Sequence, residues 1–577
     1  MGKQKQKASL PGSHPLRPIL KKPDLWMASL LGVGAFIILF MFRAESQSGD
    51  SLSYAFAVRS GQGLFHPTHL LYSPIVRLFF LAMSQIFRTA DVILAAQLHN
   101  IIWAVVSISL FYSIVQRLSQ SRFLGVMGAL FLLFTRGFWA NTTQVEIYIP
   151  GLGCLLVIIA ILILRRSFKL TGLDILMISL FFSLSVFYHQ LNVLFCLPLG
   201  FLLISKFGRP AVKPAVRILL ISTAVILAAY LLAFLTTAFP KNIGGFLKFC
   251  LFYVHYPIPS WASLKNLSLK GLGILFLSQS QGVVMVLKPW YLPGAILSAL
   301  GFGLLTAWNF FHIRKHAVQT EIRIFTFIWL AVNYALLLWY DPSEPDLFIS
   351  TLVPILLLIL LTIKDLETKI GGRNLLKIVL SGFFIGSLVF MTLGNFGRNV
   401  RPMHASKSAN YEEALALNSC APQKSLIFAE WDLEQSLIFY FEKTGVLGAL
   451  FPPLYFYQHL ILPADFQVEG DRSLIFPVEV ANPGKDLWGY DGFKNSAEWL
   501  KFIEWLFHFS YDEDRKLISC RTFEVLACGR GYFLLSPSPE AVDGLLDFFR
   551  RLDQELADRL GDLSRPFQSW LEKRTPS

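Results

Sequence analysis

The sequence predicts a polytopic α-helical membrane protein of about eleven transmembrane helices, followed by a soluble α/β or α+β domain. Of the 577 residues, 54% are hydrophobic and only 15% are charged, whereas a soluble globular protein carries about 25% charged residues. The charges are also unevenly placed. Residues 1–394 contain 12 acids and 32 Lys and Arg, and residues 395–577 contain 26 acids and 19 Lys and Arg. We therefore divide the chain into a cytoplasmic basic N-terminus (1–24), a membrane domain (25–394) and an extracytoplasmic soluble domain (395–577).

The excess of positive charge in the first part does not indicate a nucleic-acid partner. The basic residues stand between long apolar runs, as the positive-inside rule expects for the cytoplasmic loops of a membrane protein. The basic residues before residue 25 fit a cytoplasmic anchor in the same way. The partner that this pattern predicts is the lipid bilayer, with no nucleic acid.

Apolar runs of about 20 residues identify the spanning helices. The eleven predicted segments are 25–43, 92–116, 123–136, 147–165, two within 174–206, 217–239, 293–312, 323–340, 346–363 and 376–394. Two more stretches, 70–87 and 268–288, are ambiguous, and thirteen spans result if both cross. If both instead lie on the membrane surface, every dense basic loop falls on the cytoplasmic side. Pro74 and Arg77 within 70–87 also suit an interfacial helix.

This topology gathers the scarce acids of the membrane domain on the external face, and the first external loop (44–91) carries the leading candidate. Asp50 lies in "SGDSLSYAF" just beyond the first span. A partly desolvated carboxylate gains basicity, so Asp50 could act as a general base that takes a proton from a hydroxyl. The alternative is structural: Asp50 could cap a helix that begins at Ser51. The two roles are compatible.

A second external loop, "NTTQVEIYIP", contributes Glu146. This residue could share the acid–base work, hold a substrate hydroxyl or bind a cation, or it could be a solvated loop charge. His189 interrupts an apolar run, which makes it a functional candidate, although hydrogen bonds between helices could also satisfy it. His66 and His69 flank Pro67, and one of them could contact a phosphate unless both serve the turn.

Just beyond the last span, Arg398 and Arg401 could hold a lipid phosphate or could anchor the helix by snorkelling. The turn "DPSEPD" at 341–346 favours an exposed loop with helix capping over a substrate contact. No Walker, zinc-protease or serine-hydrolase motif appears. No cysteine spacing indicates a metal site, and a disulfide among the cysteines of the soluble part would leave one unpaired.

The soluble part shows alternating strand and helix signals. Residues 424–445 predict a buried strand, an acidic turn and a helix that ends at Gly445. Two strands and an amphipathic helix from about Ser538 follow in "RTFEVLACGRGYFLLSPSPEAVDGLLDFFRRL". No catalytic signature is present in this part of the chain.

Taken in order, the motifs resemble a known superfamily. The sequence has "GDS" at 49–51, His66-Pro67 followed by Leu71-Tyr72, and Trp139 before "VEIY" at 145–148. This order resembles the GT-C integral-membrane glycosyltransferases, and most closely the bacterial relatives of protein O-mannosyltransferases. Two positions depart from the family pattern. Ser53 stands where relatives carry a second acid, and "HPTH" replaces HPPG.

The resemblance implies a sugar donor carried on a polyprenyl phosphate, a surface helix like 70–87, and an acid of the first external loop as catalytic base. Carried over, it makes Asp50 the base of an inverting transfer to an acceptor hydroxyl, with Glu146 as the acid of the second loop. Substrate-binding candidates, among which a histidine or an external arginine would stabilise the leaving phosphate, are Arg59, His66, His69, Tyr72, His189, Arg398 and Arg401.

No metal site is expected and no cofactor is required, because phosphate departs easily; whether a divalent metal takes part stays open. The acceptor could be a protein, a lipid or a glycan. We expect a bacterial inner membrane with the site facing the periplasm. Two other readings remain: a transporter or lipid-linked-sugar flippase, which would place charges near the bilayer midplane, and a non-catalytic scaffold.

Overall fold

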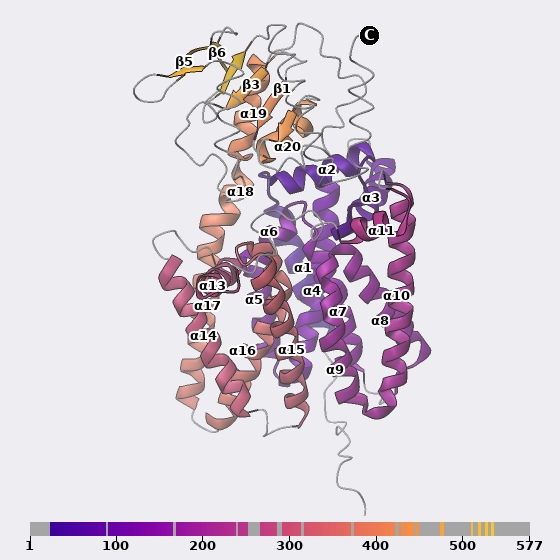
Figure 1. The fold of residues 1–577 in the computed structure, drawn as a ribbon. Coiled ribbons are helices and arrows are strands. Elements are labelled where there is room, and N and C mark those ends of the chain that lie inside the picture. The colour runs from indigo at the N-terminus through magenta and orange to yellow at the C-terminus, as the bar shows by residue number, and fades with distance from the viewer. Residues whose placement is uncertain are drawn as a thin grey trace, which may run out of the picture.

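The protein is a bundle of long helices with a small β-sheet region at one end (Figure 1). The computed structural model describes residues 24–87, 91–165, 169–237, 240–251, 266–284, 291–312, 317–370, 374–421, 426–429, 431–442, 446–448, 474–477, 509–511, 517–520, 525–528 and 532–535. The expected basic N-terminal tail before residue 24 and the expected helix near Ser538 lie outside these ranges.

Each of the eleven predicted apolar segments contains a helix. The helices are α1 (Leu25–Met41), α4 (Val92–Ser119), α5 (Arg122–Phe134), α7 (Tyr148–Leu164), α8 (Gly172–Tyr188), α9 (Cys196–Phe207), α10 (Val212–Leu235), α14 (Tyr291–His312), α15 (Ala317–Tyr340), α16 (Ile349–Ile370) and α17 (Asn374–Asn395). Within the described residues, five helical segments are long and apolar enough to cross a membrane, or six if the bent pair of α5 and α6 (Arg136–Thr143) is one span. The chain is thus an integral membrane protein, and the count of eleven spans stays a prediction.

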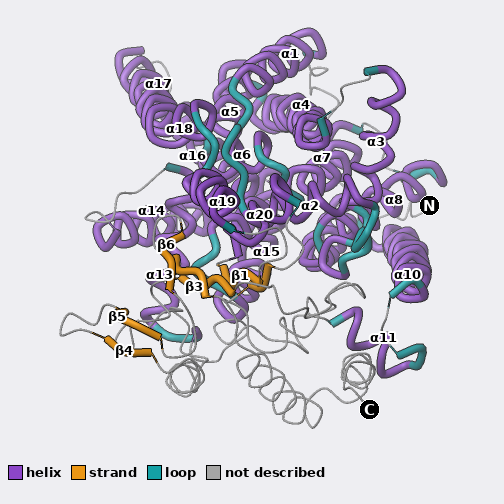
Figure 2. The backbone as a smooth tube through the Cα atoms, turned by 90° about the horizontal axis from the view of Figure 1, so that it is seen from above, coloured by secondary structure: helices purple, strands orange, loops and turns teal. Residues whose placement is uncertain are grey.

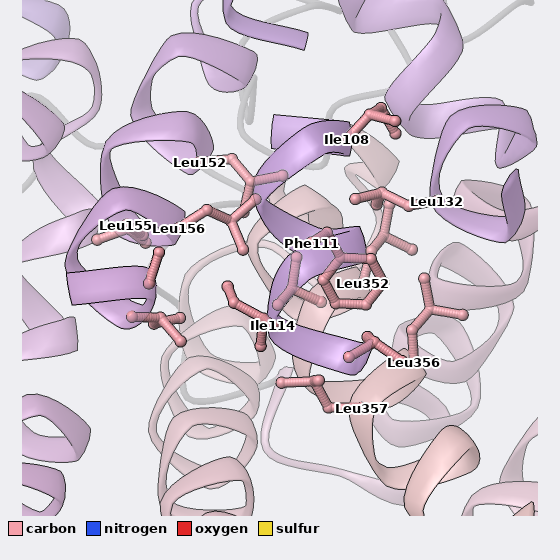
Figure 3. Close-up of a cluster of buried hydrophobic side chains, with 14 of the residues drawn as sticks. Ile108, Phe111, Ile114, Leu132, Leu152, Leu155, Leu156, Leu352, Leu356 and Leu357 are labelled. Atoms are coloured by element: carbon pink, nitrogen blue, oxygen red, sulfur yellow. The ribbon is translucent and has the colours of Figure 1, made fainter. Parts of the chain in front are cut away.

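The core of the bundle is built around α4, which packs against α1, α5 and α7. Figure 3 shows leucine, isoleucine and phenylalanine side chains from α4, α5, α7 and α16 meeting in one buried cluster. The helices approach each other closely where one of them carries a glycine. A Cβ atom on Gly153 of α7 would lie 2.6 Å from Cε3 of Trp103 on α4. Burial of this apolar surface holds the scaffold that carries the site.

Two short helices lie at the end of the bundle nearest the sheet, where α2 (Gly49–Ser60) runs across the tops of the long helices (Figure 1). Helix α3 (Tyr72–Ile86) packs on α2 and α4. Arg77 of α3 donates from Nη1 to the carbonyl oxygens of Val58 (2.7 Å) and Arg59 (3.2 Å), which satisfies the C-terminus of α2. The helix stops at Gly61, whose φ of 78° suits glycine.

Shorter elements complete the bundle. These are the 3-10 helices η1 (Pro67–His69), η2 (Gln190–Phe195), η3 (Arg209–Ala211) and η6 (Pro345–Phe348), and the α-helices α11 (Ile243–Cys250) and α13 (Leu269–Val283). The ambiguous stretches 70–87 and 268–288 thus contain α3 and α13. Whether either lies on a membrane surface stays a prediction.

The chain leaves the bundle as one nearly continuous helix. Helix α17 passes into a π-helix (Phe396–Val400) and α18 (Arg401–Ala405), and α19 (Ala409–Cys420) follows. The strands are β1 (Leu426–Ala429), β2 (Val446–Gly448), β3 (Leu474–Pro477), β4 (Phe509–Tyr511), β5 (Leu517–Cys520), β6 (Val525–Cys528) and β7 (Tyr532–Leu535). Helix α20 (Trp431–Phe441) follows β1. The strand and helix predicted within 424–445 and the two strands predicted after residue 521 are therefore present.

The main sheet is mixed, with the strand order β2-β1-β3-β7-β6. Strand β1 pairs in parallel with β2 and β3, with Leu426 opposite Leu474. Strand β7 is antiparallel to both β3 and β6, with Ile475 opposite Leu534. A parallel β1-β2 pair needs a crossover, and α20 supplies it. Strands β4 and β5 form a separate antiparallel pair.

Candidate active site

The N-terminus of α2 is the centre of the candidate site. Ser48 caps the helix, because its Oγ accepts a hydrogen bond from the amide of Ser51 at 3.0 Å. The expectation that Asp50 caps a helix beginning at Ser51 is therefore wrong: the helix begins two residues earlier, and the cap falls on the preceding serine. Asp50 lies in the first turn and its side chain is exposed. The positive end of the helix dipole favours a carboxylate at this position.

Glu146 lies behind this first turn and is buried, with 6% of its surface exposed. Its Oε1 is 3.0 Å from Ser48 Oγ and 3.0 Å from Ser51 Oγ, so it accepts hydrogen bonds from both hydroxyls. Its backbone oxygen accepts a hydrogen bond of 2.7 Å from Asn100 Nδ2. Burial, followed by the negative charges of Asp346 and Asp50, raises the pKa of Glu146 well above 4.5. The interpretation of Glu146 as a solvated loop charge does not fit this burial.

The two loops that carry these acids are joined by amide side chains. Gln47 Oε1 accepts a hydrogen bond from the amide of Val145 at 3.1 Å. Gln97 of α4 donates from Nε2 to the carbonyl oxygens of Ala44 (2.8 Å) and Thr143 (2.6 Å), one in each loop. The positions of Asp50 and Glu146 relative to each other are thus set by several hydrogen bonds.

A third acidic segment, residues 341–346, lies against the same region. Asn141 donates from Nδ2 to Asp346 Oδ1 at 2.7 Å. Glu344 caps η6 by accepting from the amide of Asp346, and burial followed by the charge of Asp346 raises the pKa of Glu344 to about 8. The capping prediction for this turn is confirmed, but the turn is not fully exposed, since Asp341 is only 7% exposed.

Three histidines lie close together, and the ring of His69 is 4.7 Å from that of Tyr54 on α2, centroid to centroid. The rings of His66 and His69 stack with centroids 4.2 Å apart. His66 also caps η1, and its Nδ1 is 2.8 Å from Thr68 Oγ1, so its role in the turn is confirmed. Burial, then the charges of His66 and His189, lowers the pKa of His69 well below 6.5. His69 Nδ1 is buried and has no hydrogen-bond partner in the described structure.

His189 opens onto a pocket deeper in the bundle. Its ring lies 5.0 Å from the ring of Tyr148, centroid to centroid. The cavity has a volume of about 20 Å³, which is room for about a single water molecule. Apolar and polar side chains line it together: Tyr148, Leu152, His189, Leu191, Asn192, Asn333, Leu347, Ile349 and Ser350.

No family model and no curated protein match this sequence. Solved structures do match. ArnT from Cupriavidus metallidurans bound to undecaprenyl phosphate superposes with a TM-score of 0.54 at 10% sequence identity, over 90% of this chain and 98% of that one. The chain has the GT-C fold, as this ArnT structure does. Two further matches have lower scores: an Archaeoglobus fulgidus oligosaccharyltransferase (TM-score 0.44, 12% identity, 79% of this chain and 68% of that one) and ArnT in the apo state (0.37, 11%, 89% and 98%).

Within this GT-C fold, the structure brings Asp50, Glu146, His66, His69 and His189 to one end of the bundle. Tyr72 lies near them, because it interacts electrostatically with Glu146. Arg59 is at the other end of α2, where its Nη2 donates to the carbonyl oxygen of Phe439 at 2.9 Å. Tyr72 is fully buried against Tyr54, with ring centroids 5.7 Å apart.

Arg398 lies on the π-helix and Arg401 opens α18, and both side chains are exposed. Across the described ranges, no group of three or more His, Cys, Asp or Glu side chains is arranged to hold a metal ion.

The sequence analysis missed three residues that shape the candidate site. Asp432 of α20 accepts a hydrogen bond of 2.6 Å from the amide of Gly49. Asn100 holds the Glu146 loop, and Asn141 binds Asp346. Asn100 offered a weak signal, because a buried amide inside a spanning helix must find a partner. Asp432 offered none, since an acid in the first turn of a helix is ordinary.

Proposed function

We propose that this chain is an inverting glycosyltransferase that moves a sugar from a polyprenyl-phosphate donor to an acceptor hydroxyl, with Asp50 as the general base. The observation that carries the proposal is the exposed Asp50 carboxylate at the N-terminus of α2, held beside buried Glu146. The GT-C fold supports it, because the matching ArnT structure holds undecaprenyl phosphate. That lipid is a polyprenyl phosphate, the carrier part of the proposed donor.

The proposed reaction is a single displacement. Asp50 takes the proton of the acceptor hydroxyl as the acceptor oxygen forms a bond to the anomeric carbon. The bond between that carbon and the phosphate oxygen breaks on the opposite face, and the polyprenyl phosphate leaves with the electron pair. The configuration at the anomeric carbon is thereby inverted. Because phosphate is a good leaving group, the displacement requires no metal.

The histidines are proposed to meet the leaving phosphate. His69, His66 and His189 lie close together, with His69 against Tyr54 of α2, and the lowered pKa keeps the ring of His69 neutral at pH 7. A neutral imidazole still donates one hydrogen bond, which can stabilise negative charge as it develops. Arg398 and Arg401 are exposed and could bind the lipid phosphate from the bilayer side.

Glu146 is proposed to act through α2. Its carboxylate binds the hydroxyls of Ser48 and Ser51, which flank Asp50 in sequence. It thereby fixes the first turn of α2 and, with it, the position of Asp50.

We place the site on the periplasmic face of a bacterial inner membrane. Under the predicted topology, the loops of α2 and Glu146 lie opposite the basic loops. Cys420 of α19 is disulfide-bonded, and disulfides persist in oxidising compartments such as the periplasm. The acceptor is then a protein, lipid or glycan of the cell envelope.

Asp50→Asn tests the assignment. A strain lacking the gene is complemented with the wild-type chain, with Asp50→Asn, or with Glu45→Gln as a matched exposed acid of the same loop. Envelope lipids and proteins are compared by mass spectrometry. We expect a glycan that the wild type and Glu45→Gln restore and that Asp50→Asn does not, because loss of a general base costs about 10²–10⁴ in rate. A folded Asp50→Asn variant that restores the glycan at the wild-type rate would remove Asp50 from the mechanism.

A further inference from the structure

The helix that carries Asp50 is also held by the C-terminal part of the chain. Helix α20 lies along α2, and Figure 2 shows the two helices beside each other when seen from above. At one end, Gly49 donates its amide hydrogen to Asp432 Oδ1 at 2.6 Å. At the other, Arg59 donates to the carbonyl oxygen of Phe439, and its guanidinium lies 4.4 Å from the centroid of the Phe439 ring. The two helices therefore run in the same direction and meet at both ends.

Apolar packing joins the two helices between these ends. Phe439 is 5% exposed and belongs to the same buried cluster as Leu52, Ala55 and Val58 of α2. The pairing of α20 with α2 is thus a packed interface as well as a polar contact.

We propose that Asp432 is a positioning residue for Asp50, so that the C-terminal part of the chain completes the active site. The inference rests on the proposed function for the role of Asp50 itself. Gly49 immediately precedes Asp50, and its amide is one of the first helical N–H groups, which have no partner within their own helix. Asp432 binds that amide, while Glu146 binds the next turn through Ser48 and Ser51.

Asp432 also belongs to the charged surroundings of the base. Its carboxylate is bound to the residue next to Asp50, and Asp50 interacts electrostatically with Glu146, Glu344 and Tyr148. The hydrogen bond to Gly49 therefore fixes where the base lies relative to these groups.

Two variants separate the hydrogen bond that Asp432 accepts from the charge that it carries. Asp432→Asn keeps an oxygen that can accept from Gly49 but removes the charge, and Asp432→Ala removes both. Glu412→Gln on α19 is the matched control, because this carboxylate is exposed in the same part of the chain. The full-length proteins are reconstituted in proteoliposomes with the polyprenyl-phosphate sugar fraction extracted from host membranes. Hydrogen–deuterium exchange of residues 48–54 is measured on the same samples.

We expect Asp432→Ala to increase exchange at 48–54 and to lower kcat by about 10- to 100-fold, with little change in KM, because a misplaced base slows the chemical step. Asp432→Asn should restore the slow exchange and most of kcat. Glu412→Gln should match the wild type throughout.

Unchanged exchange in Asp432→Ala would overturn the proposal, because the contact would not anchor α2. Faster exchange with an unchanged kcat would also overturn it, and Asp432 would then be structural only. A wild-type protein that transfers no sugar would overturn the proposed function and the catalytic part of this inference together. The exchange data would distinguish that failure from a failure of the anchor alone.

Discussion

Replacing Glu146 separates the two things that its carboxylate does in the folded protein, which are to accept hydrogen bonds and to carry a buried charge. Glu146→Gln retains an Oε1 atom that can accept from Ser48 and Ser51, and it removes the charge. Glu146→Ala removes both functions. The two variants should therefore change stability in opposite directions at neutral pH.

The loss of stability that follows from the lost hydrogen bonds can be estimated from the burial of their donors. Ser51 is fully buried, and its hydroxyl would lose its acceptor in Glu146→Ala. An unsatisfied buried polar group costs about 1–3 kcal/mol. We therefore expect the free energy of unfolding of Glu146→Ala to fall below that of Glu146→Gln by about 1–3 kcal/mol.

The effect of the Glu146 charge on the free energy of unfolding depends on pH. Burial raises the pKa of Glu146 in the folded state above its ordinary value of 4.5, so the folded protein binds this proton more tightly than the unfolded chain does. Its contribution to stability is therefore largest below pH 4.5 and is lost as the pH rises to the raised value. Each unit of the shift corresponds to about 1.4 kcal/mol. Glu146→Gln has no such loss, so it should be more stable than the wild type at about pH 8.

The measurement is thermal unfolding of the detergent-solubilised protein from about pH 5 to about pH 9. The wild type should lose stability relative to Glu146→Gln across this range, and Glu146→Ala should be the least stable at low pH. Glu45→Gln, an exposed acid of the neighbouring loop, is the control and should follow the wild type. If Glu146→Gln were as unstable as Glu146→Ala, or had the same pH dependence as the wild type, the burial argument would be refuted.

Two further predictions concern the scaffold, and both are checked by thermal unfolding. Gly153→Ala should destabilise by about 1–3 kcal/mol, because its Cβ would lie 2.6 Å from the Trp103 ring. Gly273→Ala on α13, with no atom within 4 Å, should be neutral or stabilising; equal effects would contradict the packing argument. Arg323 is buried and binds Asp365 at 2.6 Å, so Arg323→Met should cost about 3–5 kcal/mol by leaving that carboxylate unpaired. Adding Asp365→Asn should recover much of the loss, and no recovery would contradict this account.

Much of the helical architecture could be predicted because a membrane helix is identified by one continuous run of apolar residues. Apolar runs of the right length became helices from α1 to α17, and the interruption at residues 188–192 became the short 3-10 helix η2. The strands near residues 426 and 525 were likewise visible as apolar runs between turn residues. The start of α2 was misplaced because Ser48 and Asp50 are both good capping residues. Their order along the chain does not decide which one faces the free amides.

The candidate site was only partly predictable, because its geometry depends on contacts between distant segments. Asp50 and Glu146 could be assigned to one face from the charge pattern of the loops. The burial of Glu146 and the exposure of Asp50 could not be predicted, since both depend on where α2 packs in the folded protein. The hydrogen bond from Ser48 to Glu146 joins residues 98 positions apart. The bond from Gly49 to Asp432 joins residues 383 positions apart.

These separations have a physical consequence for the base itself. Helix α2 has only 12 residues, and isolated helices of this length are marginal in water. It therefore owes its position to its partners: Glu146 at its cap, Arg77 at its C-terminus and α20 along its side. Two of these partners belong to the membrane part of the chain, and the third belongs to the C-terminal part. Any change that separates the two parts should thus weaken α2 first, and with it the placement of Asp50, while the core of the bundle around α4 stays packed.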